Sequence, residues 1–196
     1  MVSIKFNIIQ YVNNRFAIIF KKRNYLKHIL LLMIFFTFSF ASLNHIYSFE
    51  ADFTQNITDE KNKVLTYNGH LIASKPLYAL WRYIKPVKKD IYINSYNVTI
   101  IEPEIEQVIV KRIESKFDFF SIVESAREIK KDVYQAFYRE SKFTITSKNG
   151  FIESISYLDE FDNKVKILFT NQKQNMEIDN STFVPKIPSE FDLIKD

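Results

Sequence analysis

Apolar and polar residues alternate along most of this chain, and this pattern restricts its fold more than any other sequence feature. A period of two is typical of a strand with one buried face, because successive side chains point to opposite sides of a sheet. The alternating runs extend from Phe49 to Ile57, Leu65 to Ala73, Ile91 to Ile93, Phe143 to Ile145, and Val165 to Phe169. We therefore expect a mainly antiparallel β-structure.

Turn-forming residues separate these runs at short intervals. Breaks fall at 59–62, 75–76, 85–86, 148–150 and 159–163, and each contains Asn, Asp, Pro or Gly, which turns favour. We count about nine to eleven strands, a number typical of a sandwich or of a large, open barrel.

One segment has helical rather than strand periodicity. Within 117–130, apolar residues recur at intervals of three and four, namely Phe119, Ile122, Val123, Ala126 and Ile129. Ser121 and Glu124 also fit a capping box, and a short helix is expected around 42–48. The concave face of the sheet is the nearest apolar surface for such helices, so we predict a curved sheet with a few amphipathic helices against it.

The segment 77–84 is apolar on both faces of its predicted strand. Two interpretations remain open. The strand is buried on both sides, or one face lines a cavity for an apolar ligand, as larger barrels allow. The inward face is predicted to carry Leu77, Ala79, Trp81 and Tyr83, because Arg82 lies on the other face.

The first 41 residues are typical of a secretory leader. A basic patch at 21–27 precedes an apolar run at 29–41, which ends with small residues at Ser39 and Ala41, the order of a cleavable signal peptide. The run is short for a membrane-spanning helix, which needs about 20 residues, although an uncleaved anchor or a core helix stays open. Residues 1–20 make this leader unusually long. We expect an exported protein with one domain at 42–196.

Charge and composition exclude several functional classes. Six of the 27 basic residues and none of the 23 acidic ones lie in 1–41, so 42–196 carries 21 basic and 23 acidic residues, a formal charge of −2. A nucleic-acid-binding domain would carry a basic excess itself. With no Cys and only two Gly, disulfides, thiolate metal sites, Cys nucleophiles and glycine-rich phosphate loops are excluded. Since the chain also lacks a G-x-S-x-G elbow and a metal-spaced His pair, we expect no enzyme, metal or cofactor.

Several short motifs occur in an order that resembles one known family. Phe53-Thr-Gln55 comes first, followed by Gly69-His-Leu-Ile-Ala-Ser-Lys75-Pro76, then Trp81 and Pro86, then Pro103 with Gln107-Val, and last Phe183-Val-Pro-Lys-Ile-Pro188 in an expected terminal strand. Each motif is weak alone. Their ordered series over 48–192 resembles the LolA family of outer-membrane lipoprotein carriers.

The resemblance implies a fold and a function. The family's fold is a single curved antiparallel sheet of about eleven strands, an unclosed half barrel, with a helical lid. Its members bind the acyl chains of lipoproteins released from the inner membrane by an ABC-type complex and deliver them to an outer-membrane receptor. For this chain the resemblance implies a periplasmic chaperone, without enzymatic activity or cofactor, and we expect a monomer.

Site residues follow from strand parity and from the resemblance. The predicted acyl-chain cavity is lined by Phe49, Phe53, Leu71, Leu77, Ala79, Trp81, Tyr83, Ile91 and Ile93. The predicted lid and latch comprise Lys75, Pro76, Phe119, Ile122, Val123 and Ala126.

Lys75 departs from the family pattern. An arginine usually precedes the proline there and holds the lid closed by bonds to lid carbonyls. Since lysine lacks the rigid fork of arginine, the resemblance implies looser closure in this chain. An ordinary solvated turn lysine is the other interpretation of Lys75.

A second function stays open beside the carrier. It is a periplasmic stress-sensing or regulatory module that binds a protein partner on a similar half barrel. His45 and His70 are expected at surface or turn positions, and Glu102, Glu104 and Glu106 in a solvated loop.

Overall fold

The computed structural model describes residues 43–112, 119–138 and 141–195. The chain divides into two units at residue 41, and every described residue belongs to the second, Ala41–Asp196, which is compact. The predicted leader at 1–41 lies outside the described residues. In the part of the chain that the structure describes, no helix has the length and apolar character needed to cross a membrane.

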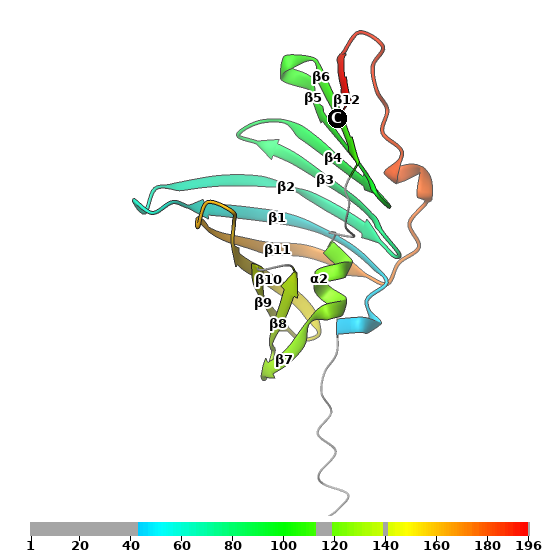
Figure 1. Cartoon of the computed structure of the whole chain (residues 1–196). Coiled ribbons are helices and arrows are strands. Elements are labelled where there is room, and N and C mark those ends of the chain that lie inside the picture. The colour runs from blue at the N-terminus through cyan, green and yellow to red at the C-terminus, as the bar shows by residue number, and fades with distance from the viewer. Residues whose placement is uncertain (1–42, 113–118, 139–140, 196) are drawn as a thin grey trace, which may run out of the picture. The chain divides into compact units, whose positions relative to one another are not determined.

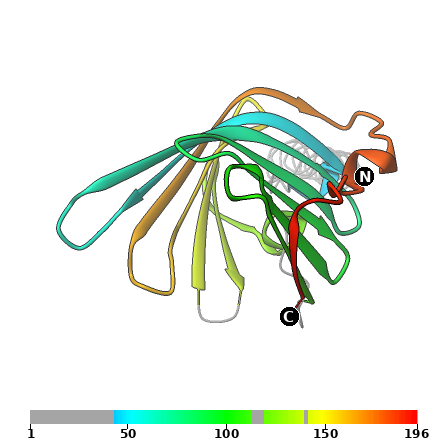
Figure 2. The ribbon, with the colours of Figure 1, turned by 90° about the horizontal axis from the view of Figure 1, so that it is seen from above.

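A single sheet forms the body of the second unit (Figure 1). Its strands are β1 (Ser48–Thr58), β2 (Val64–Ser74), β3 (Tyr78–Lys85), β4 (Lys89–Asn94), β5 (Asn97–Glu102), β6 (Gln107–Arg112), β7 (Arg127–Lys130), β8 (Val133–Tyr138), β9 (Ser141–Lys148), β10 (Phe151–Leu158), β11 (Lys164–Gln174) and β12 (Asp192–Lys195). Their order across the sheet is β12-β6-β5-β4-β3-β2-β1-β11-β10-β9-β8-β7, with β12 and β7 at the two edges. Figure 2 shows the curvature of this sheet.

The prediction of one open, mainly antiparallel sheet is confirmed, with two differences. The sheet has twelve strands rather than about eleven, and β12 pairs with β6 in parallel. The expected terminal strand over 183–188 is wrong, because Phe183 ends a 3₁₀ helix, η3 (Asn180–Phe183), and pairing resumes only at β12.

The two predicted helices are present but shorter than the periodicity predicts. The short helix expected before the first strand is the 3₁₀ helix η1 (Leu43–His45), and a further 3₁₀ helix, η2 (Pro103–Ile105), joins β5 to β6. The helix α2 spans Phe119–Ser125. Residues 117–118 lie outside the described residues.

The helical prediction for 127–130 is wrong. These residues form β7, which pairs with β8 at the sheet edge and leaves Ile129 58% exposed. Ser121 lies inside α2 and therefore does not cap it. The Arg127 side chain donates to the carbonyls of Glu124 and Ala126, which satisfies backbone acceptors where the helix ends.

Two hairpin turns at one rim of the sheet repeat the same local structure. Asp59 Oδ1 accepts hydrogen bonds from the backbone amides of Lys61 and Lys63, and Asp159 Oδ1 accepts them from Phe161 and Asn163. A residue with positive φ completes each turn, at positions 62 and 162. These Asx-type turns set the register of the β1–β2 and β10–β11 pairs, so that both hairpins end at the same level.

Both faces of the sheet carry an apolar cluster. On the concave face, buried side chains from β1, β2, β3 and β8 to β11 pack with those of α2 and η1. On the convex face, Leu80, Tyr92, Ile101 and Val108 pack under Phe183, whose ring stacks on Tyr78 at 5.5 Å. Strand β3 is therefore apolar on both faces because the C-terminal segment covers its outer side.

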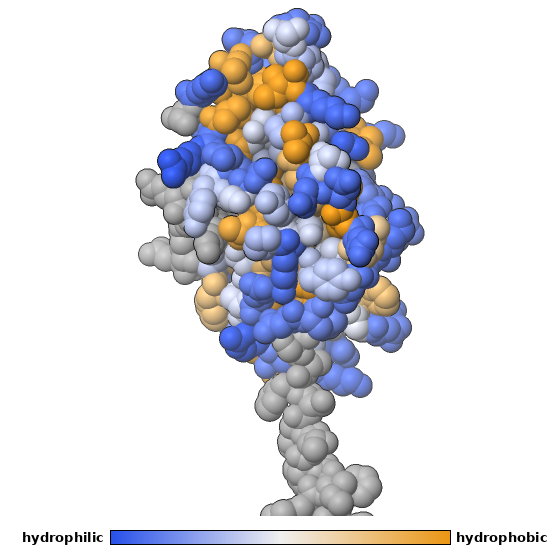
Figure 3. Space-filling model, turned by 90° about the vertical axis from the view of Figure 1, so that its right-hand side faces the viewer, coloured by the Kyte–Doolittle hydropathy of each residue, from blue (hydrophilic) through white to orange (hydrophobic). Residues whose placement is uncertain are grey.

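Part of the apolar surface near β12 remains exposed. Figure 3 shows apolar side chains gathered at the β12 end of the sheet. Val184, Ile187 and Leu193 of the C-terminal segment are exposed. The convex cluster is thus a second, smaller core with an open margin.

Candidate binding site

Helix α2 lies against the concave face of the sheet and buries its apolar side there. Phe119, Phe120, Ile122 and Val123 are all buried, and the Phe119 ring lies 4.7 Å from the ring of Phe49 on β1. The helix also contacts η1, β2 and β8. We call α2 and η1 together the lid.

An apolar cavity of about 200 Å³ remains between α2 and the sheet. It is lined by Gln55, Trp81, Tyr83, Ile91, Ile93, Phe119, Ile122, Phe143, Ile155, Tyr157 and Ile167. A cavity of about 150 Å³ in another protein holds one benzene molecule, so this volume is too small for a long acyl chain.

One polar pair lies among these apolar side chains. The Tyr83 hydroxyl donates to Gln55 Oε1 at 2.9 Å, and burial raises the pKa of Tyr83 far above its usual range. Each group satisfies the other, which avoids the cost of an unpaired buried polar atom.

The floor of the cavity depends on a glycine. Phe53 faces Gly69 across the β1–β2 pair, and its ring meets the rings of Trp81 and Tyr83 edge-on at 5.2 and 5.1 Å. A Cβ at position 69 would lie 2.2 Å from the Arg82 carbonyl oxygen and 2.5 Å from the Phe53 ring. Only glycine leaves room for this arrangement.

Lys75 joins the sheet to both parts of the lid. Its ammonium donates to the Asn44 carbonyl in the turn of η1 at 3.1 Å and lies 2.8 Å from the Glu124 carboxylate on α2. It also lies 5.7 Å from the centre of the Phe120 ring, within cation–π range. The lysine that follows β2 therefore holds η1 and α2 at the same point, which an ordinary solvated turn lysine would not do.

The structure places the predicted cavity residues in two groups. Trp81, Tyr83, Ile91 and Ile93 line the cavity itself. Phe49, Phe53, Leu71 and Ala79 are fully buried around it. Leu77 lies in the turn before β3, half-buried, and not on the inward face of a strand, because β3 begins only at Tyr78.

The predicted lid residues also divide. Phe119 and Ile122 line the cavity, whereas Val123 and Ala126 are buried in the surrounding core. Pro76 is exposed in the turn beside Lys75.

Several lining residues escaped the sequence-based list. Gln55 belonged to a noted motif but is polar, and Phe143, Ile155, Tyr157 and Ile167 come from the far half of the sheet. The alternation at 143–145 and 165–169 marked some of these residues as inward-facing. No sequence feature indicated that β9, β10 and β11 curve round to face β3 and β4.

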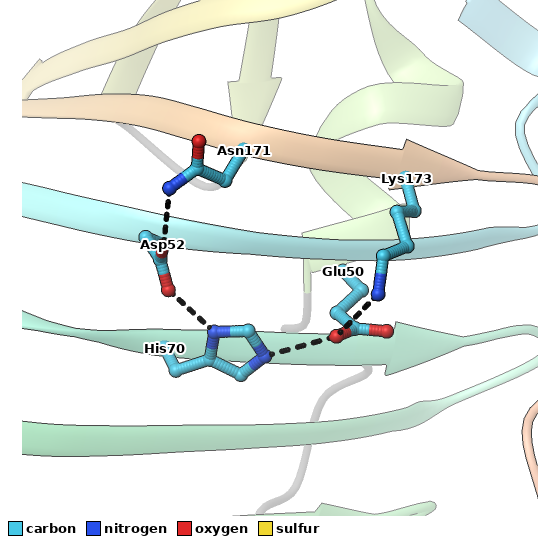
Figure 4. Close-up of polar contacts among 5 residues, drawn as sticks. All are labelled: Glu50, Asp52, His70, Asn171 and Lys173. Carbon is cyan, nitrogen blue, oxygen red and sulfur yellow. Dashed lines mark hydrogen bonds and ion pairs between the residues drawn. The ribbon is translucent and has the colours of Figure 1, made fainter.

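A polar network lies on the outer side of the same strands (Figure 4). His70 Nδ1 lies 2.8 Å from Asp52 Oδ1 and its Nε2 lies 3.4 Å from Glu50 Oε1. Asn171 donates to Asp52, and Lys173 pairs with Glu50. His70 is therefore half-buried on a strand, in a network that links β1, β2 and β11. Both of its ring nitrogens face carboxylates, so neither is positioned to activate a nucleophile.

The described residues contain no group of His, Asp and Glu side chains suited to a metal ion. The geometry defines a class of protein, an open curved sheet with a helix against its concave face and an apolar cavity between the two.

The comparisons with known proteins give this class a family. The model of the family described as outer membrane lipoprotein carrier protein LolA matches residues 44–186, and the chain belongs to this family. An outer-membrane lipoprotein carrier protein of Campylobacter jejuni is 40% identical over 169 residues, which cover 86% of this chain and 99% of the relative. One of Wolinella succinogenes is 32% identical and covers 85% of this chain and 97% of the relative.

A solved structure of a LolA superfamily protein from Nitrosomonas europaea is 8% identical, with a TM-score of 0.45, and covers 72% of this chain and 91% of the other. The family assignment rests on the sequence matches.

Proposed function

We propose that this protein is a periplasmic carrier that holds the acyl chains of lipoproteins in its cavity and carries them to the outer membrane. The observation that carries the proposal is the apolar cavity under α2 in a chain of the LolA family. The relatives that support it are named outer-membrane lipoprotein carrier proteins. The protein performs no covalent chemistry in this role.

The energetics of the cargo explain why such a cavity needs a lid. Burying one sixteen-carbon chain is worth about 0.8 kcal/mol per methylene, or about 12 kcal/mol. A carrier with a permanently open cavity would bind so tightly that release would be slow. Because Phe119 and Ile122 of α2 occupy part of the cavity, the cargo must displace them, and its net affinity falls by the free energy of lid closure.

Lys75 is the latch of this lid in our proposal. Its contacts with Asn44 and Glu124 exist only while η1 and α2 lie against the end of β2. Lid opening breaks both contacts at once. The lysine thus takes the place of the family's arginine, with a carboxylate partner supplementing the backbone carbonyl.

The route of the cargo is also part of the proposal. The protein would receive lipoproteins from an inner-membrane ABC-type releasing complex and pass them to an outer-membrane acceptor. The leader at 1–41, with its apolar run at 29–41, would direct it to the periplasm and be removed there.

Purification from the periplasm tests the carrier function. We expect proteins with acylated N-termini to co-purify in a one-to-one complex, and a palmitoylated peptide to displace an apolar dye from the purified protein. A regulatory module would instead retain one non-acylated protein partner. Absence of both acylated proteins and dye displacement would refute the carrier function.

A lid variant tests the role of α2. Replacing Ile122 and Val123 with Asp places charges where both side chains are now buried, so the helix should leave the sheet and dye binding should rise. Ser125→Asp, at the exposed end of the same helix, is the matched control and should bind dye like the unmodified protein. Equal dye binding by both variants would contradict the proposed competition between helix and ligand.

A further inference from the structure

A second hollow lies at the hairpin end of β9, β10 and β11. Its volume is about 1060 Å³, slightly above the range of about 300–1,000 Å³ that is usual for ligand sites. Most of its lining residues are of polar or charged type, although apolar atoms make up more of the lined surface: Ser141, Lys142, Thr144, Ser156, Tyr157, Leu158, Asp159, Glu160, Asp162, Lys164, Val165 and Lys166. We call this hollow the rim groove.

The rim groove passes from one face of the sheet to the other. It is lined by both Ser156 and Tyr157 on β10, and by both Val165 and Lys166 on β11. Since adjacent residues of a strand point to opposite faces, a groove lined by both members of each pair extends around the sheet margin. Val165 belongs to the concave core, whereas Lys166 is exposed.

The rim groove adjoins the apolar cavity. Tyr157 lines both hollows, and its ring lies 4.9 Å from that of Phe143, which also lines the cavity. The pairing of β9 with β10 extends only as far as Thr144 and Ser156, although β9 begins at Ser141 and β10 continues to Leu158. Figure 2 shows the β10–β11 hairpin standing apart from the beginning of β9.

The charges of the rim groove suit a polar chain rather than an anionic surface. Three lysines and three acidic residues line it. The acidic residues lie together at the tip of the β10–β11 hairpin, where Asp159 already binds the turn amides. The lysines and the hydroxyls of Thr144 and Ser156 lie along the strands. An anionic membrane would meet no net positive charge here, whereas the amides of a peptide would find donors and acceptors.

An acylated polypeptide has one end that requires an apolar site and another that requires polar partners. Its backbone amides cannot enter the apolar cavity without losing their hydrogen bonds, so the chain must leave the cavity where a polar path begins. We propose that the rim groove holds the first residues of the cargo polypeptide in extended form, while the attached acyl chain occupies the cavity. This inference rests on the proposed carrier function.

The test compares two probes with the same acyl chain, one without and one with a polypeptide. Affinities of the full chain are measured for palmitate and for a palmitoylated peptide of eight polar residues. Ser156→Trp fills the rim groove, and Lys164→Glu with Lys166→Glu makes it strongly acidic without adding bulk. Thr170→Trp, at an exposed position further along β11 and outside the groove, is the matched control.

We expect both groove variants to bind the palmitoylated peptide about tenfold more weakly, the effect of losing about one good hydrogen bond to a charged group. Their affinity for palmitate should not change, and the control variant should match the unmodified protein with both probes. A photo-crosslinking residue in place of Lys142 in the otherwise unmodified chain should label the peptide.

The outcomes separate the two proposals. If palmitate and the palmitoylated peptide both fail to bind the unmodified protein, the carrier function fails and the groove inference with it. If both bind, but the groove variants keep full affinity for the peptide and position 142 does not label it, the carrier function stands and the rim groove has no part in holding cargo.

Discussion

Replacing Lys75 with Ala should make the protein bind acylated peptides more tightly. The substitution removes the bond to the Asn44 carbonyl and the ion pair with Glu124, both of which exist only with the lid closed. It leaves the lining of the cavity unchanged, since Lys75 is not among the cavity-lining residues. The closed state should therefore lose stability relative to the open, binding-competent state.

The magnitude follows from the two contacts. A hydrogen bond from a charged donor contributes about 1.5 kcal/mol. The ion pair adds about 0.5 kcal/mol, because the Lys75 and Glu124 side chains are 27% and 52% exposed and solvent screens them. Destabilising the closed lid by about 2 kcal/mol raises the open fraction, and hence the affinity, by up to about 30-fold when the closed state predominates.

Titration of a palmitoylated peptide against a displaceable apolar dye measures this change. Lys75→Arg retains the bond to Asn44 and is able to meet Glu124 with two parallel bonds, so its affinity should equal that of the unmodified protein or fall a few-fold. Lys85→Ala is the matched control, because Lys85 is exposed and also precedes a proline. Unchanged or weaker binding by Lys75→Ala, with the fold intact, would refute the latch.

Three further predictions concern the cavity floor and the outer face of the sheet. Gly69→Ala should lower the free energy of unfolding in urea by about 3 kcal/mol, because the new Cβ would overlap the Phe53 ring and a backbone oxygen. An unfolding free energy equal to that of the unmodified protein would show that the strands move apart to admit the Cβ without loss of stability. Tyr83→Phe should cost about 1 kcal/mol by leaving Gln55 Oε1 unpaired, and adding Gln55→Leu should recover most of it; strict additivity of the two losses would exclude a coupled pair. Hydrogen bonds from Asn171 and His70 lower the pKa of Asp52, so its stabilising effect is present above the ordinary aspartate pKa of about 3.9 and lost as pH falls through the lower folded value. Thermal melts of Asp52→Asn should thus depend less on pH in that acid range, and an unchanged acid profile would argue against this linkage.

Local alternation predicted the sheet well because the apolar residues of each strand indicate which of its faces is buried. Buried and less buried residues alternate along most of β1, from Gly69 to the end of β2, and from the start of β11 to Phe169. The turns between these strands contain the Asp and Asn residues that the structure uses. The same parity placed Trp81 and Tyr83 on the concave side.

The errors arose where tertiary pairing overrode local pattern. Ile129 continues the helical spacing of α2, yet its segment pairs with β8 and forms a strand. A short extension of the helix is only marginally stable, so the hydrogen bonds of an additional strand pair stabilise these residues more. The sequence likewise did not predict that residues 176–191 would cover the outer face, because Ile178 and Phe183 stand in a segment without regular period. The half of the cavity formed by β9 to β11 depends on sheet curvature, which no single strand encodes.

The C-terminal segment over the convex face has a consequence for the working cycle. Its packing around Phe183 shares no residue with the concave cluster that α2 completes. Filling or emptying the apolar cavity changes contacts only on the concave side of β3 and β4. The apolar packing on their convex side is therefore kept throughout. In the proposed cycle, cargo enters and leaves on the concave side while the packing behind the cavity persists.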